Sequence, residues 1–329
     1  MRGLRYVPQN SNVNFIGMRM LAFIFSAAII LGSIGITAQK GLNLGIDFTG
    51  GTVIEVRTPV MPDLEMLRTA LNELGLGSIS IQEFGQADDL LIRLPEQKKP
   101  DGWQKGDAEP NNLAIQIVRE AFDSAFEVDG QKVDYRRIEF VGPQVGAELK
   151  LKGLYAIIFS LLGILTYVWF RFEWQFGIAA IIALAHDAIA TIGLFAITQM
   201  EFNLSTVAAI LMIAGYSIND TVVVFDRIRE NLRKYKKKPL GELLNFSVNQ
   251  TLSRTIMTSV TTLLALIALY VFGGEVIRGF VYALIFGILI GTYSSIFVAS
   301  PVLMFMNIRR GKSPSDKTPT AGEPEVIVE

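Results

Sequence analysis

Cysteine is absent from the 329 residues, and histidine occurs only once. Disulfide bonds, thiolate metal sites and cysteine nucleophiles are therefore excluded, as is a zinc site built from several histidines. We expect no metal and no cofactor, and any exported part of the chain has to be held together by its own hydrophobic core. Charge is also missing over long stretches, which is unusual for a soluble domain even when half of its residues are hydrophobic.

The uncharged stretches are long enough to cross a membrane, for which a helix needs about 20 apolar residues. Six stretches approach or exceed that length, and only His186, Asp187 and Asp220 interrupt them. They are residues 20–39, 153–170, 174–200, 202–225, 255–274 and 279–308. The sequence therefore predicts an α-helical membrane protein with six transmembrane helices, helix 1 over 20–39 and helices 2–6 within 151–308. The first is expected to be an uncleaved anchor, because no small-x-small cleavage site follows it.

Basic residues in the short loops predict the orientation, because such loops carry more Lys and Arg on the cytoplasmic side. Arginines precede the first span, Arg171 lies between the second and third, and a basic connector (226–250) follows the fourth. These segments share one side if the spans alternate. We therefore expect a cytoplasmic N-terminus (1–19), connector and tail (309–329). The tail is rich in Pro, Ser, Thr, Lys and Glu and is expected to be disordered.

The long loop between the first two spans, residues 40–150, is expected on the outer side of the membrane. Acidic residues outnumber basic ones there by 19 to 12. Its hydrophobic periodicity predicts strands over 52–57, 78–84, 90–94 and 133–141, and helices over 62–74 and 113–126. The order β-α-β-β-α-β is typical of a ferredoxin-like domain. The sequence thus predicts an exported ferredoxin-like α/β domain between transmembrane helices 1 and 2.

The segment Gly45–Thr52 (Gly-Ile-Asp-Phe-Thr-Gly-Gly-Thr) nearly matches a phosphate-binding loop. However, Gly51 stands where such a loop needs its lysine, and the segment follows a membrane helix instead of a buried strand. Nucleotide binding is therefore disfavoured. We interpret the segment as a turn that redirects the chain from the membrane into the exported domain, because glycine adopts backbone angles that other residues resist.

Charged residues inside the spans are the strongest functional signal, since ionisable groups at membrane depth usually face protein and often mark ion pathways. With a rise of about 1.5 Å per helical residue, Asp220 on the fourth span and Arg254 at the start of the fifth are level and are expected to pair. Asp187, with His186 beside it, lies near the middle of the third span.

Hydroxyl groups accompany these charges and are candidates for ordering water along a proton path. Ser217 precedes Asp220 by three residues, and Thr258 follows Arg254 by four. Two other interpretations stay open: a static Asp220–Arg254 pair that only locks two helices, and a satisfied buried histidine at His186. An intramembrane aspartyl protease is disfavoured, because such enzymes need a Gly-x-Gly-Asp context and Asp220 follows Ser-Ile-Asn.

Five stretches of the sequence resemble the SecF members of the SecD/SecF family, which is part of the resistance-nodulation-division superfamily. They are Gly45–Thr52, Ile138–Leu149, Phe170–Trp174, Ala183–Asp187 and Gly215–Asn231, with Arg254 and Thr255 following. In this order and on these segments the match is specific, and it runs from about residue 40 to residue 310.

The resemblance implies a membrane subunit whose six helices pair with six from a partner, SecD. The pair associates with the SecYEG channel and with YajC, and it uses the proton motive force, or sodium in some relatives, to promote export of the translocating polypeptide. It also implies the bacterial inner membrane, with the long loop periplasmic. The lipid bilayer is thus a partner, and nucleic acid is not.

The resemblance also assigns residues. Asp220 and Arg254 match the residues implicated in ion passage, and we expect an ion or proton relay made of Asp220, Arg254, Asp187, His186, Ser217, Asn219 and Thr258. A structural motif is expected from Gly45, Asp47, Phe48, Thr49, Gly50, Gly51, Gly142 and Pro143. No role is carried onto Glu275 or Arg278, since relatives place their charges differently there.

Two other functions remain as alternatives. A small-molecule exporter of the same superfamily would normally carry a larger exported portion with a ligand pocket, whereas residues 40–150 form a small one. A non-catalytic membrane scaffold would need no titratable group at Asp220. In neither case, nor in the favoured one, is the chain expected to be an enzyme.

Overall fold

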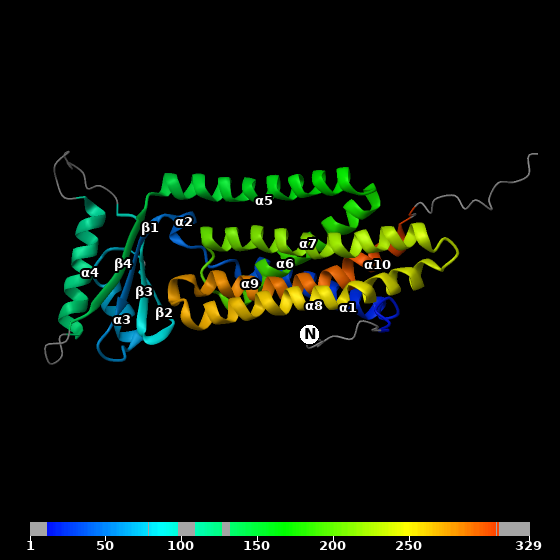
Figure 1. The fold of residues 1–329 in the computed structure, drawn as a ribbon. Coiled ribbons are helices and arrows are strands. Elements are labelled where there is room, and N and C mark those ends of the chain that lie inside the picture. The colour runs from blue at the N-terminus through cyan, green and yellow to red at the C-terminus, as the bar shows by residue number, and fades with distance from the viewer. Residues whose placement is uncertain (1–11, 78, 98–108, 127–131, 307, 309–329) are drawn as a thin grey trace, which may run out of the picture.

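The computed structural model describes residues 12–77, 79–97, 109–126, 132–306 and 308. These residues form a bundle of long helices with a small α/β domain at one end (Figure 1). The expected disordered tail 309–329 and residues 1–11 of the expected N-terminal segment lie outside the described residues.

Six long apolar helices run along the bundle, as the sequence predicts. They are α1 (Arg19–Lys40), α5 (Pro143–Arg171), α6 (Trp174–Thr198), α7 (Leu204–Lys234), α8 (Leu240–Phe272) and α9 (Glu275–Ser294). The last span continues from α9 through a π-helical turn, η1 (Ser295–Ala299), then α10 (Ser300–Val302) and the 3-10 turn η2 (Leu303–Phe305). Each is long and apolar enough to cross a bilayer, so the protein is an integral membrane protein.

Three helices, α6, α7 and α9, form the centre of the bundle, and more than half of α9 with its continuation is buried. Close approach depends on small residues: a side chain added at Gly287 would collide with Ile213 of α7, and Ala283 is fully buried. The small-residue face of the sixth span therefore packs on the fourth. By contrast α1, α5 and α8 are peripheral and mostly exposed.

The exported domain has the predicted order of elements. They are β1 (Gly51–Arg57), α3 (Leu64–Asn72), β2 (Ser80–Phe84), β3 (Gln86–Leu94), α4 (Pro110–Phe126) and β4 (Asp134–Val141). The strands form one antiparallel sheet in the order β2-β3-β1-β4, which is the ferredoxin-like arrangement. The Asp63 carboxylate accepts bonds from the backbone N–H groups of Glu65 and Met66 and so starts α3.

One face of the sheet packs against α3 and α4 through a continuous apolar core. Ile54, Leu90 and Ile92 of the sheet are fully buried against Val118 and Phe122 of α4. Helix α4 begins at Pro110, three residues before the predicted start, because proline is well tolerated in the first turn of a helix. Strand β3 begins at Gln86, four residues before its predicted start, since its pairing with β2 extends around the turn at Gly85.

We expect residues 42–148 to fold on their own. The fragment contains the whole sheet, both covering helices and their shared core, so it should be soluble and melt cooperatively. Circular dichroism should give a spectrum of mixed helix and sheet. A non-cooperative, coil-like fragment would contradict an autonomous domain.

Tyr135 is the only tyrosine in that fragment and provides an internal probe of its fold. Burial raises the pKa of its phenol, and the hydrogen bond to Asp123 (3.1 Å) raises it further. The unfolded chain ionises first, near pH 10, so the contribution of Tyr135 to stability is present below about pH 10 and is lost as pH rises towards the folded pKa. Tyr135→Phe should reduce this alkaline loss; a phenol that titrates normally in the folded fragment would contradict the packing of β4.

Candidate functional site

The carboxylate of Asp187 lies where the three central helices meet. On α6, its Oδ2 accepts hydrogen bonds from the hydroxyls of Ser217 of α7 (2.6 Å) and Ser294 of α9 (2.8 Å). Its Oδ1 lies 3.1 Å from Nδ1 of His186. All four side chains are buried. The Asp187 carboxylate of α6 is therefore bonded to α7 through Ser217 and to α9 through Ser294, so it connects three spans.

Small residues make this arrangement possible. Gly291 of α9 lies so close that a Cβ there would be 3.2 Å from Cβ of Ser217 and 3.6 Å from Oδ2 of Asp187. The ring of His186 faces Tyr293, with centroids 6.0 Å apart. The hydroxyl of Tyr293 in turn donates to the carbonyl of Ala22 (2.9 Å), which links the site to α1.

Asp220 of α7 forms a second, separate polar site. Its Oδ1 accepts a hydrogen bond of 2.6 Å from the hydroxyl of Thr255 of α8. Its Oδ2 is buried and accepts no hydrogen bond from any residue that the structure describes. The neighbouring Thr221 donates to the hydroxyl of Ser295 (3.4 Å), which lies on the π-helical turn of the last span. Asp220 therefore has one oxygen that accepts a hydrogen bond and one buried oxygen that accepts none from the described residues.

Arg254 does not form the direct ion pair with Asp220 that its depth suggested. Its side chain is exposed, and no ion pair involving Arg254 occurs within the described part of the chain. Consecutive residues of a helix point about 100° apart, so when Thr255 faces α7, Arg254 is turned outwards. The matched depth itself is as expected, because the Thr255 next to Arg254 bonds to Asp220.

The other relay candidates divide between the two sites. Ser217 bonds to Asp187 and not towards Arg254. Asn219 and Thr258 are exposed, as Arg254 is. Thr255 and Ser294 were not predicted as site residues. The spans contain many Ser and Thr residues, and only the rotation of each helix determines which of them face a carboxylate.

The last span is locally distorted beside these sites. Ser295–Ala299 form a π-helical turn, which places one extra residue in the helix. Pro301 has no N–H to give to the carbonyl four residues earlier, which favours such a widening. π-Helical turns are frequent at functional sites, and this one carries Ser295.

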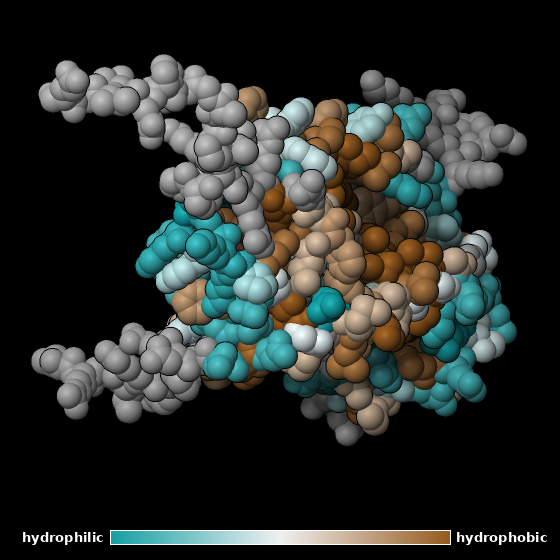
Figure 2. All heavy atoms as spheres, turned by 90° about the vertical axis from the view of Figure 1, so that its right-hand side faces the viewer, coloured by the Kyte–Doolittle hydropathy of each residue, from teal (hydrophilic) through white to brown (hydrophobic). Residues whose placement is uncertain are grey.

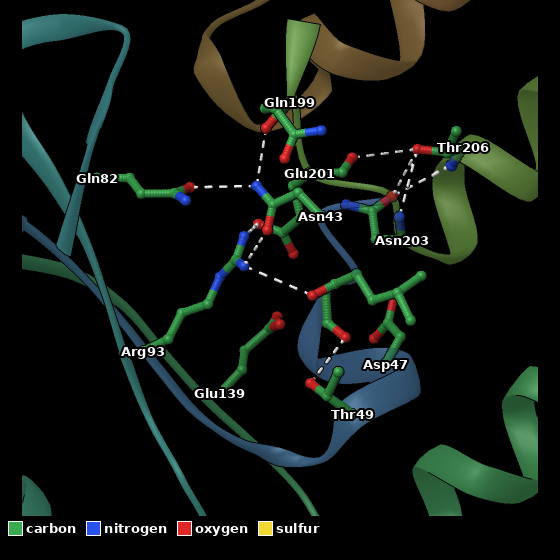
Figure 3. Close-up of polar contacts among 12 residues, drawn as sticks. Asn43, Asp47, Thr49, Gln82, Arg93, Glu139, Gln199, Glu201, Asn203 and Thr206 are labelled. Atoms are coloured by element: carbon green, nitrogen blue, oxygen red, sulfur yellow. Dashed lines mark hydrogen bonds and ion pairs between the residues drawn. The ribbon is translucent and has the colours of Figure 1, made fainter. Parts of the chain in front are cut away.

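A third group of polar residues joins the exported domain to the bundle (Figure 3). Asp47, on the one-turn helix α2 (Ile46–Thr49), accepts a bond from the backbone N–H of Leu204, the first residue of α7 (2.9 Å). Arg93 of β3 forms an ion pair with Glu201 (2.9 Å) and donates to Asn43 (2.7 Å). The domain is therefore bonded to the loop between α6 and α7 and to the start of α7.

The backbone at this joint is unusual. Gln199, which ends α6, is the only non-glycine residue in the described ranges with a positive φ (53°). Its carbonyl accepts a bond from the Asn43 side chain (2.8 Å). The backbone N–H of Gly45 donates to Phe202 (2.9 Å), and that of Phe202 to Asn43 (2.8 Å). These bonds hold residues 43–45, which precede the domain, against residues 199–202, which precede α7.

The motif residues gather around the same joint. Gly50 (φ 71°) and Gly51 (φ 111°) turn the chain into β1, and a Cβ at Gly51 would lie 2.5 Å from the carbonyl oxygen of Leu94. The ring of Phe48 packs against Phe202, and Thr49 donates to the carbonyl of Gly45 (3.1 Å). Gly142 and Pro143 start α5. The segment therefore makes the turn that its glycines indicate.

Asp47→Ala should loosen α7 at its N-terminal end, because the first N–H of that helix loses its acceptor. Loss of a cap costs about 0.5–2 kcal/mol, so the thermal midpoint of the full-length chain in detergent should fall. Asp47→Asn keeps an acceptor and should recover most of the difference.

Asp63→Ala is the matched control, because it removes a cap of α3 within the exported domain alone. Hydrogen exchange should accelerate at residues 204–207 in Asp47→Ala and stay unchanged there in Asp63→Ala. Equal protection of 204–207 in both variants would show that Asp47 does not hold α7.

Together these features define an integral membrane protein of six apolar helices, with carboxylates buried between them and a ferredoxin-like domain bonded to one end. Residues 121–309 match the sequence model of "Protein export membrane protein SecD/SecF, C-terminal", and residues 35–58 match that of the "SecD/SecF GG Motif". The chain therefore belongs to the SecD/SecF family, in its SecF branch.

Its relatives match almost end to end. The "Protein translocase subunit SecF" of Rickettsia felis is 46% identical over 312 residues, which cover 94% of this chain and 97% of that relative. The protein of the same description from Rickettsia akari is 47% identical over 307 residues, covering 92% of this chain and 95% of that relative.

The fold also matches solved structures. The crystal structure of SecDF, described as a translocon-associated membrane protein from Thermus thermophilus, superposes with a TM-score of 0.80 at 38% identity over 91% of this chain. A structure of SecDF in a super-membrane-facing form gives a TM-score of 0.65 at 36% identity over 93% of this chain. The chain spans 39% and 40% of the length of those two proteins.

Proposed function

We propose that this chain is the SecF-type subunit of a Sec protein translocase, which works with SecD and draws on the proton motive force to promote protein export. The observation that carries the proposal is Asp220: a buried carboxylate with one free oxygen, at the depth of an exposed arginine. A proton carrier needs a group that can change protonation, and an oxygen without a donor is where a proton can be added.

The exposed position of Arg254 supports a partner bundle. A guanidinium at membrane depth is costly against lipid tails, so such residues usually face protein or water. Asn219 and Thr258 are exposed polar residues as well. We infer that six helices of SecD cover this side, in keeping with SecDF chains that are more than twice as long as this one.

The two carboxylates are proposed to differ in role. Asp187 is held on both oxygens by His186, Ser217 and Ser294, so it serves as a fixed anchor of the relay. Asp220 is held on one oxygen by Thr255 and exchanges the proton. Thr221, the residue next to Asp220, donates to Ser295 of the last span, and Ser295 interacts with the Asp220 carboxylate. These hydroxyls are proposed as part of a route between the two carboxylates.

Helix α7 is the proposed link from proton to export. It carries Ser217 and Asp220 within the bundle, and its first residue is bonded to Asp47 of the exported domain. A shift of α7 that follows protonation is therefore passed to the exported domain through the joint. Each charge that crosses the membrane supplies about 2.3 kcal/mol per 100 mV, and the translocating polypeptide is the load.

The remaining assignments follow from the family. SecYEG and YajC are the proposed neighbours, the bacterial inner membrane is the location, and no cofactor or enzymatic reaction is involved. Both termini and the basic connector 226–250 are proposed to be cytoplasmic, and the domain at 40–150 periplasmic.

The orientation is testable by cysteine labelling, since the native chain offers no background. Cysteines placed at Gly102 and Asp107 should react with a membrane-impermeant thiol reagent in intact spheroplasts, and one placed at Lys236 should react only after lysis. Labelling of Lys236→Cys alone in intact spheroplasts would invert the proposed orientation.

Asp220→Asn should keep assembly with SecD but remove the export that depends on the gradient, because the amide cannot carry the proton. The measurement is translocation of a secreted protein into vesicles with and without a proton gradient. Glu242→Gln, an exposed acid at the start of α8, is the control and should export normally.

A double variant separates the relay from a structural lock. If Asp220 only locks α7 to α8 through its bond to Thr255, Asp220→Val with Thr255→Val should restore much of the export, since no unpaired polar group remains buried. If Asp220 carries the proton, the double variant should assemble and stay inactive. Normal gradient-dependent export by Asp220→Asn would refute the relay and favour the scaffold alternative.

A further inference from the structure

A cavity of about 470 Å³ lies at the end of the bundle farthest from the exported domain. It sits between the end of α5 and the last turns of α7, and is lined by Arg171, Asp226, Arg229, Glu230, Arg233 and Lys234. It is distinct from both carboxylate sites, and no residue of the proposed relay lines it.

The acidic residues of this cavity are already neutralised. Arg171 donates to both oxygens of Asp226 (3.0 and 3.2 Å). Glu230 pairs with Arg227, which lies outside the cavity (2.7 Å).

Three cations therefore remain without an acidic partner. Arg229 donates only to the backbone carbonyl of Arg171 (3.3 Å), and neither Arg233 nor Lys234 forms an ion pair within the ranges that the structure describes. The cavity thus presents an excess of positive charge, two thirds of it on forked guanidinium groups that suit phosphate oxygens.

The surroundings place this cavity at the surface of a bilayer. Trp169, Phe170 and Trp174 flank Arg171 and are 66%, 90% and 57% exposed. Exposed aromatic residues of this kind mark the membrane–water interface. Phe225 ends the apolar stretch 202–225 of α7, so Arg229 and Arg233 lie about 6 and 12 Å further along the helix, at and just beyond the headgroup layer.

Below the cations the surface is apolar. Leu162 and Tyr167 of α5 are about half exposed, and α5 as a whole is the least buried of the six spans. Seen from this end of the bundle, hydrophobic surface fills the middle of the view, is hollowed, and is bordered by hydrophilic residues (Figure 2). A charged head region thus lies next to an apolar flank.

We propose that this cavity is a binding site for an anionic phospholipid. Its phosphate binds Arg229 and Arg233, Lys234 adds charge, and its acyl chains lie along the exposed flank of α5. The aromatic and apolar flank decides for a lipid over an acidic protein segment or a free phosphate, because neither of those needs a hydrocarbon-facing wall next to the cations.

Tryptophan fluorescence can test the proposal, because the chain has three tryptophans and two of them, Trp169 and Trp174, flank the cavity. With Trp103→Phe as the background, the full-length chain is reconstituted in nanodiscs that contain brominated phosphatidylglycerol or brominated phosphatidylcholine in equal amounts. Quenching should be stronger with the anionic lipid.

Arg229→Gln with Arg233→Gln should abolish this preference and lower the affinity for phosphatidylglycerol about thirtyfold, if each arginine contributes as cations near an anionic surface usually do. Lys237→Gln with Lys238→Gln removes the same charge from the same connector outside the cavity, and should leave the preference within about twofold.

The other outcomes are decisive as well. An equal loss in both double variants would show a diffuse surface charge and overturn the site. Reversal of quenching by inorganic phosphate at matched ionic strength would show a soluble ligand instead of a lipid. A thermal melt of each variant in detergent checks folding. If the glutamine variant unfolds, Arg229→Lys with Arg233→Lys replaces it, because lysine keeps the charge but not the forked guanidinium. Native mass spectrometry then measures the phosphatidylglycerol that this variant retains.

Discussion

A carboxylate at membrane depth has to be bonded by the protein itself, because the hydrocarbon core offers no water to do so. This constraint organises the whole bundle. Asp187 accepts a hydrogen bond from a hydroxyl of α7 and another from a hydroxyl of α9, and Asp220 accepts one from a hydroxyl of α8. The small residues of the last span let α9 approach α6 and α7 closely enough for the short bonds at Asp187. Hydrogen bonds between buried side chains of neighbouring helices therefore require close helix packing.

A few polar bonds also position the exported domain. The exported domain has its own apolar core, but its position is set by a few polar contacts, chiefly the Asp47 bond to the start of α7 and the Arg93–Glu201 pair. Because α7 also carries Asp220, one helix is in contact with both the candidate ion site and the exported domain. The sheet and its covering helices thus have their own core, and the domain is joined to the bundle through α7, the loop before it and the start of α5.

Much of this could be predicted from the sequence. Length and hydropathy are sufficient for six spans, since a helix that crosses a bilayer has to be apolar over its whole length, and alternating periods with turn residues give the β-α-β-β-α-β order. The hydrogen-bond and ion-pair partners of individual side chains were harder to predict. The direct Asp220–Arg254 pair was expected from depth alone, but the rotation of α8 presents Thr255 instead. Likewise nothing in the local sequence of Asp47 indicates that it bonds to a residue 157 positions later.

The π-helical turn at Ser295–Ala299 has a consequence for register. An extra residue in one turn rotates everything that follows by about 100° and advances it by about 1.5 Å relative to a regular helix. Conversion of that turn to regular α-helix would therefore act as a one-residue ratchet: Ser294 would keep its contact with Asp187, whereas Leu303 and its neighbours would present another face to the core. The face that the last span presents to the core after Ala299 is therefore set by this one turn.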